Sequence, residues 1–195
     1  MDGTNISYAT CFAMYNHESG ILATSRYVAD VQRSTSRETQ LLARINGQWL
    51  PGKVLCPNEL AESMGKESNL AVIKLDGDGR APAGIPLGSA SGTWAAFIAG
   101  FSNAKDKAAK FHMGEGSTLS LGMHEFGVTT PFRKSWTGGP VLDTTGHVVG
   151  VITGKKGEMT VATTAETLIF YSMVLDLEFP AYPGDSCSGE DIEYL

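Results

Sequence analysis

The chain has 195 residues, of which 42% are hydrophobic and 18% charged, and its formal net charge is −6. This composition is ordinary for a globular domain with a hydrophobic core. The acidic balance argues against nucleic acid or an anionic membrane surface as a partner. The longest apolar run, residues 168–175, is too short to span a bilayer.

The three cysteines, Cys11, Cys56 and Cys187, are odd in number and widely spaced. They match neither a zinc motif nor a disulfide framework, so we expect no metal or other cofactor and a reducing, intracellular location. The N-terminal residues lack the basic and apolar pattern of a signal peptide.

Short strands separated by turn residues, the usual pattern of an all-β domain, run through the first part of the chain. Strands are predicted at 8–15, from 21 to 23, and at 39–45, 48–55 and 70–75, with a compact segment at 25–30. Asn46-Gly47 suits a tight hairpin turn between two of them. Together these strands could close a first barrel over residues 6–76.

Residues 77–84 are rich in glycine, aspartate and proline and are predicted to be a linker. Further strands are predicted at 94–100, 118–121, 126–130, 140–143, 148–153 and 159–163, with turns at 144–146 and 154–157. These would form a second barrel over 85–164. A C-terminal helix is predicted within 165–179, followed by an acidic, loosely packed tail at 180–195.

The most specific motif is the run 135–140, Ser-Trp-Thr-Gly-Gly-Pro, followed by an apolar strand, a glycine turn and a second apolar strand. It resembles the nucleophile loop of trypsin-like serine proteases of the HtrA/Deg type. Two more segments resemble that family in the expected order, and they place Arg26 at its histidine position and Asn69 at its aspartate position. Residues 85–89, Ile-Pro-Leu-Gly-Ser, also fit. The resemblance implies one trypsin-like domain over 1–195, an all-β double six-stranded barrel with a C-terminal helix.

The three positions that correspond to the catalytic triad hold residues that cannot perform the usual chemistry. In the family a histidine removes the serine proton and an aspartate orients and stabilises that histidine. Arg26 carries a permanent charge and cannot be a general base, and Asn69 has no charge to stabilise an imidazolium. Thr137 keeps a hydroxyl, which needs an adjacent base to become a nucleophile. The resemblance therefore implies a degenerate family member.

The loop around Thr137 departs from the family as well. Ser135, Trp136 and Thr137 occupy the oxyanion-loop positions, and Ser135 replaces a glycine whose N–H normally holds the oxyanion. Trp136 either lines the substrate cleft or folds back over the barrel. With Gly138 and Gly139, it makes up the cleft residues that we expect to contact a partner.

Four histidines, His17, His112, His124 and His147, are candidates for a substitute base, although each is more simply a surface or structural residue. His112, His124 and Glu125 would form a metal site only if their loops converged.

The leading hypothesis is a catalytically inactive protease homologue that binds a peptide or protein, by strand addition in the cleft between the barrels. An active hydrolase using Thr137 and a structural domain in a larger assembly are the alternatives. A sharper hypothesis places the acidic residues 190–195 against a cationic cleft at Arg26.

Overall fold

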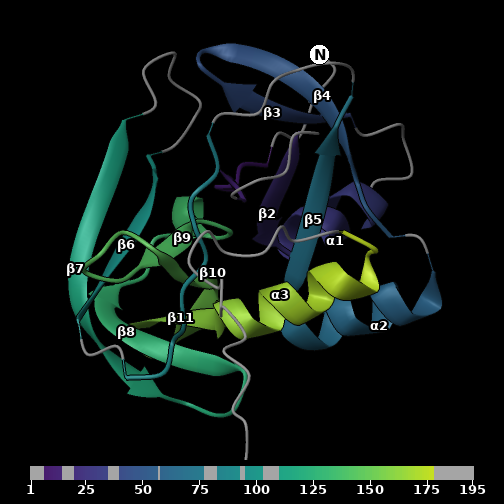
Figure 1. Cartoon of the computed structure of the whole chain (residues 1–195). Helices are drawn as coiled ribbons and strands as arrows, with labels where there is room; N and C mark the ends of the chain where they lie inside the picture. The colour runs from purple at the N-terminus through teal and green to yellow at the C-terminus, as the bar shows by residue number, and fades with distance from the viewer. Residues whose placement is uncertain are drawn as a thin grey trace, which may run out of the picture.

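Figure 1 shows the computed structural model of the chain, which describes residues 7–14, 20–34, 40–56, 58–76, 83–92, 95–102 and 110–177. The expected linker falls mostly outside these ranges, and the tail at 180–195 lies wholly outside them. None of the helices in these ranges has the length and apolar character that crossing a membrane requires.

The described residues of the first half form an antiparallel five-stranded sheet and two helices, and the strand order is β1-β2-β5-β4-β3. Its elements are β1 Phe12–Ala13, β2 Ile21–Ser25, α1 Tyr27–Ser34, β3 Leu41–Ile45, β4 Gln48–Val54, α2 Glu59–Ser68 and β5 Leu70–Leu75. The predicted strand at 70–75 is confirmed as β5, which lies in the middle of the sheet and has almost all of its residues buried. The predicted hairpin is also confirmed, because Asn46 and Gly47 both have positive φ, 51° and 83°.

Two parts of the first half differ from the sequence prediction. The strand expected at 8–15 shrinks to β1, because Thr10 bonds to the other half of the molecule: its N–H donates to Thr137 O at 2.8 Å and its hydroxyl to Ser135 O at 2.8 Å. The helix α2 was not predicted. It begins where the Asn58 side chain accepts the Ala61 N–H at 2.8 Å, which is a standard N-cap.

The second half is a closed barrel with the strand order β10-β11-β8-β7-β6-β9. Its strands are β6 Ala95–Phe101, β7 Phe111–Ser120, β8 Glu125–Pro131, β9 Pro140–Leu142, β10 Val148–Lys156 and β11 Met159–Thr164, with the 3-10 turn η1 Lys134–Trp136 before β9. Two barrels of six strands were predicted. The second half confirms this number, whereas the described residues of the first half form a five-stranded sheet.

Two strands of the barrel are at least three residues longer than the sequence predicted. β7 begins seven residues before the expected strand at 118–121, and β10 continues through Lys156, so the turn lies at Gly157 rather than over 154–157. The first difference arises because β7 carries glycines at the inner positions Gly114 and Gly116, where the side chain of Thr130 fills the space. Glycine in a strand is a poor sequence signal.

The C-terminal helix α3, Ala165–Val174, packs back onto the first half and completes its core. In Figure 1 it lies beside α2, below the sheet. The core cluster shared by β1, β2, β5, β10, α2 and α3 comprises Phe12, Met14, Ile21, Ala23, Ala61, Leu70, Val72, Leu87, Val148, Val151, Leu168, Tyr171 and Leu175. The two halves are therefore joined through one apolar interior rather than through a few surface contacts.

The turn between β9 and β10 is organised by the carboxylate of Asp143. One of its oxygens accepts the Thr145 N–H at 2.8 Å, the Thr145 hydroxyl at 2.7 Å and the His147 N–H at 3.0 Å. Partial burial alone would raise the pKa of Asp143, but these hydrogen bonds and the nearby His147 outweigh it and lower the pKa below 3.8. The native turn therefore favours the ionised carboxylate.

This turn predicts a pH-dependent loss of stability in the variant Asp143→Asn. Because the folded pKa is lowered, the carboxylate stabilises the native state above pH 3.8, and this contribution is lost as the pH falls through the folded value. We expect the variant to lose about 1 kcal/mol of unfolding free energy at neutral pH. In urea unfolding, the difference from the wild type should disappear in acid; a difference that grew in acid would contradict this account.

Candidate functional site

The residues at the three triad positions are held close together by the backbone. Arg26 follows β2, and its N–H donates to Asn69 O at 2.8 Å. Gly138, next to Thr137, lies against the end of β2, because a Cβ on it would be 2.9 Å from Ser25 N. The structure thus brings the three segments into one region between the halves, as the sequence resemblance implied.

The Arg26 side chain is an internal structural cation. It is 6% exposed, and its Nε lies 3.0 Å from Asp30 Oδ1 on α1. One terminal nitrogen donates to Glu62 O on α2 at 3.2 Å, and the other lies 4.0 Å from the Glu62 carboxylate. The expected cationic cleft is therefore not formed by Arg26, because its charge is buried and directed to carboxylates on both helices. This removes the basis for placing the acidic tail against Arg26.

Asn69 has a clear role in the backbone. It is the C-cap of α2 with φ 56° and ψ 27°, and its N–H returns to the carbonyls of Gly65 and Lys66. Asparagine is one of the few residues that adopts this left-handed conformation readily. Its side chain is exposed.

Thr137 follows the 3-10 turn η1, and the backbone N–H groups of its loop are already used. The Trp136 N–H donates to Arg133 O at 2.9 Å, and the Thr137 N–H donates to Lys134 O at 3.2 Å. The next two, those of Gly138 and Gly139, donate to Ile152 O and Trp136 O. An oxyanion site needs free donors at the nucleophile, and here the N–H of Thr137 faces a carbonyl of its own loop.

The side chain of Trp136 lies inside the second barrel, in the cluster with Ile98, Phe126 and Val141, and is 3% exposed. It rests on Gly100, where an added Cβ would be 2.5 Å from the indole ring. Its Nε1 is buried without a hydrogen-bond partner in the described part of the chain. Of the two positions considered for Trp136, the one folded onto the barrel is found.

The three residues expected to line the cleft, Trp136, Gly138 and Gly139, are all buried. Gly139 is covered by Ala99 O and the Trp136 carbonyl, which a Cβ would approach too closely. In the described residues these positions form the packed floor between the halves and offer no surface to a partner.

None of the described histidines forms a hydrogen bond with Thr137. His147 belongs to the Asp143 turn, His124 contacts Thr167 Oγ1 at 3.2 Å, and His112 lies on β7. His17 lies outside the described residues. Within the described ranges, no group of three histidines, cysteines or carboxylates comes close enough to hold a metal ion, so His112, His124 and Glu125 do not form the metal site considered above.

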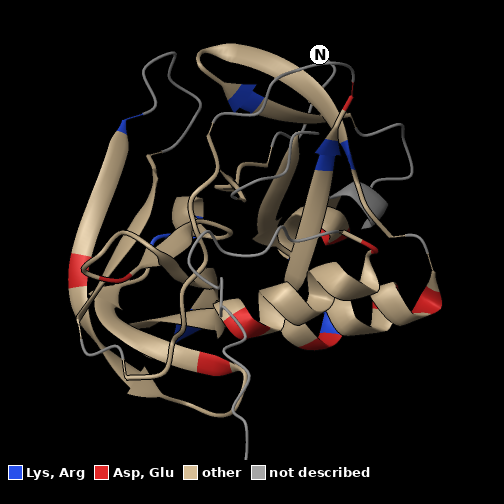
Figure 2. Ribbon diagram, viewed as in Figure 1, with Lys and Arg blue, Asp and Glu red and all other residues tan. Residues whose placement is uncertain are grey.

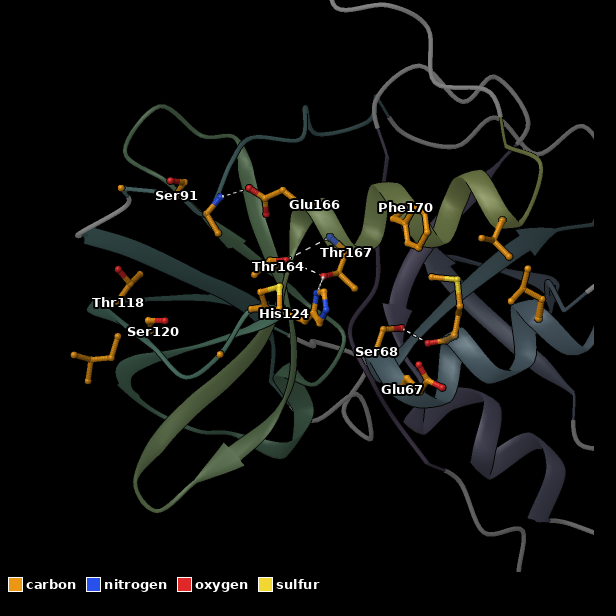
Figure 3. A pocket seen from close by; sticks show the side chains of 18 residues that line it. Glu67, Ser68, Ser91, Thr118, Ser120, His124, Thr164, Glu166, Thr167 and Phe170 are labelled. Atoms are coloured by element: carbon orange, nitrogen blue, oxygen red, sulfur yellow. Dashed lines mark hydrogen bonds between the residues drawn. The ribbon is translucent and has the colours of Figure 1, made fainter.

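A large groove lies between α2, α3 and the turn that joins β7 to β8. Its volume is about 1050 Å³, and Figure 3 shows the side chains that line it. Its apolar lining includes Leu60, Met64, Met123, Phe170 and Val174. Sequence reasoning missed this site because it missed α2, although Asn58 followed by strong helix formers is a usable N-cap signal.

The turn from 122 to 124 is tied to α3, so the groove has three fixed walls. The Thr164 N–H donates to His124 O at 3.0 Å, and the His124 ring contacts Thr167. The α2 wall is fixed as well, because the Thr163 hydroxyl donates to Ser68 O at 2.7 Å. The groove is thus pre-formed by secondary structure from both halves.

Comparisons with known proteins agree with this architecture. The family model described as a trypsin-like peptidase domain matches residues 9–151. The crystal structure of Deg5 superposes with a TM-score of 0.66 at 18% sequence identity, covering 84% of this chain and 82% of that one. The serine endoprotease from Yersinia pestis superposes with a TM-score of 0.66 at 14% identity, covering 89% of this chain.

The chain spans 59% of the Yersinia pestis protein, and both structural likenesses concern the fold alone. No curated protein sequence matches the chain. The closed barrel, the C-terminal helix and the structural neighbours confirm the trypsin-like, HtrA/Deg-like fold expected from the sequence. The match over residues 9–151 establishes that the chain belongs to the trypsin-like peptidase domain family.

Proposed function

We propose that this chain is a catalytically inactive homologue of the serine proteases that acts by binding a peptide or protein. The main support for the proposal comes from Arg26, which stands where the family has its catalytic histidine. The guanidinium of Arg26 is buried and bound to Asp30 and Glu62. A group held in this way cannot take a proton from Thr137.

Two further features support the same conclusion. The Thr137 N–H, which an oxyanion would need, donates to Lys134 O instead. Among the described residues, no histidine or carboxylate is hydrogen-bonded to the Thr137 hydroxyl, as a hydrolase built on Thr137 would require. Losing one oxyanion donor alone costs a protease about 10²–10³ in turnover.

The thiol of Cys11 forms no disulfide with another described residue, which supports an intracellular, reducing location as part of the same proposal.

We expect the purified protein to give no covalent labelling with a serine-directed fluorophosphonate and no cleavage of casein. Trypsin under the same conditions is the positive control. The variant with Arg26→His, Asn69→Asp and Thr137→Ser is also expected to stay inactive, because these three changes leave the Thr137 N–H bonded within η1.

Labelling of the wild type that disappears in Thr137→Ala would contradict the proposed function. Activity restored by the triple change would instead contradict the role given to the η1 turn.

A further inference from the structure

We infer that the groove between α2, α3 and the β7–β8 turn is a docking site for a protein segment that carries apolar anchors followed by lysine or arginine. This inference rests on the proposed function, since it names the surface that would do the binding and the chemistry of its partner.

The two helices that line the groove run in opposite directions along it. The bond from the Thr163 hydroxyl to Ser68 O brings the end of α2 to the beginning of α3. In Figure 3, Ser68 lies near His124, and Phe170 lies further along α3 than Thr164 and Thr167. The lining residues of the two helices can therefore be matched end to end.

One end of the groove is apolar. Leu60 and Met64 lie one turn apart on α2, and Phe170 and Val174 lie one turn apart on α3. Leu60 is 61% exposed and Phe170 is 59% exposed. Large apolar side chains gathered in a hollow at such exposure are typical of an interaction surface, and methionines such as Met64 adapt to different partners.

The other end of the groove carries two carboxylates beside the turn that holds Met123. Glu67 on α2 and Glu166 on α3 line its two walls, and none of the described residues that line the groove is a lysine or arginine. Figure 2 shows the acidic positions of α2 and the beginning of α3. Glu166 is held in place, since it accepts the Ser89 hydroxyl at 2.6 Å and the Ala90 N–H at 3.0 Å.

The spacing between the two ends defines the ligand. Glu67 and Leu60 are seven residues apart on α2, and Glu166 and Val174 are eight apart on α3, which is roughly 10–12 Å along each helix. A ligand therefore needs apolar side chains and a cation about two helical turns away, the pattern of an amphipathic helix laid into a groove.

The acidic charge of the groove favours a basic partner over two other possible occupants, the C-terminal residues 178–195 and a second copy of the chain. Residues 178–195 contain five acidic and no basic residues, so they would meet like charge at Glu67 and Glu166. A second copy of the chain, with a net charge of −6, would do the same. A basic segment would instead be attracted to this end of the groove, and its apolar face would cover Phe170 and Leu60.

The test uses the full chain and a fluorescein-labelled amphipathic peptide with leucines on one face and two lysines beyond them, with Kd measured by anisotropy. We expect the lysine peptide to bind about tenfold more tightly than the same peptide with glutamines instead of lysines. The double variant Glu67→Gln, Glu166→Gln should remove this tenfold preference, and Phe170→Ser should weaken both peptides at least tenfold.

Matched controls lie on β7, outside the groove. Glu115→Gln removes an exposed carboxylate and Phe111→Ser removes a phenylalanine of similar exposure, 56%. Neither should change the Kd. Thermal unfolding of each variant identifies any change caused by misfolding.

Failure of this inference can be told apart from failure of the proposed function. Absence of peptide binding, or binding unaffected by the Phe170 and glutamate variants, would overturn the docking site and leave inactivity standing. Displacement of the lysine peptide by a synthetic peptide of residues 178–195, or a concentration-dependent dimer that excludes the peptide, would overturn the basic partner. Cleavage of the peptide by the wild type would overturn the proposed function.

Discussion

The variant Gly138→Ala is expected to lose about 3–5 kcal/mol of unfolding free energy, from steric overlap and backbone strain together. Gly138 has φ 85°, which an alanine adopts only at a cost. An added Cβ would also overlap Thr24 Oγ1 and Thr10 O and would lie 2.9 Å from Ser25 N. Thr10 O already accepts the Thr24 hydroxyl at 2.8 Å, so neither group can move without breaking a buried hydrogen bond.

Substitutions at two other glycines distinguish the cost of steric overlap from the cost of backbone strain. Gly146 has the same φ, 85°, but no described residue comes within 4 Å of an added Cβ, so Gly146→Ala should cost only about 1 kcal/mol. Gly154 has no described neighbour within 4 Å of an added Cβ and no positive φ, so Gly154→Ala should be nearly neutral. Equal losses for Gly138→Ala and Gly146→Ala in urea unfolding would show that the contact with β2 is unimportant.

The variant Trp136→Ala should destabilise the protein by about 3–5 kcal/mol, because it empties the interior of the second barrel. The indole packs against Gly100 and Gly114, and neither has a side chain that could fill the space. The Arg133 guanidinium also lies over the ring of Trp136, 4.9 Å from the ring centre. The measurement is again the unfolding free energy in urea.

The matched substitution is Trp49→Ala on β4, where the tryptophan is 49% exposed. It loses mainly a stacked Arg44, so about 1 kcal/mol is expected. Trp136→Phe should cost less than Trp136→Ala, since it keeps a ring and removes the unpartnered buried Nε1. A loss from Trp136→Ala no larger than that from Trp49→Ala would mean that the side chain is not a core residue.

The sequence predicted well those elements whose signals are local. Asn46-Gly47 favours a tight hairpin turn by backbone preference, and the short apolar run of β5 favours a buried strand. The C-terminal helix predicted within 165–179 was also found, and it ends at Val174. By contrast, β1 is short because Thr10 bonds to a loop 125 residues away, which no local pattern contains.

In the candidate site, too, features with local sequence signals were predicted, whereas features that depend on distant residues were not. The motif positions Arg26, Asn69 and Thr137 could be recognised from spacing, and the structure brings them together. The direction of a side chain could not be read in this way. Arg26 is paired with Asp30 and also donates to the backbone of Glu62, on a helix that was not predicted, and Trp136 turns inward because two distant glycines leave room for it.

The packing of α3 on the first half has a consequence for synthesis of the protein on the ribosome. Leu168, Tyr171 and Leu175 complete a core whose other members begin at Phe12. While the barrel strands are still being synthesised, α3 does not yet cover the apolar face of β2 and β5. The first half therefore cannot complete its fold before the second half is made. Until α3 is synthesised, this exposed apolar face can cause the nascent chain to aggregate, and a chaperone bound to it during this interval would prevent that.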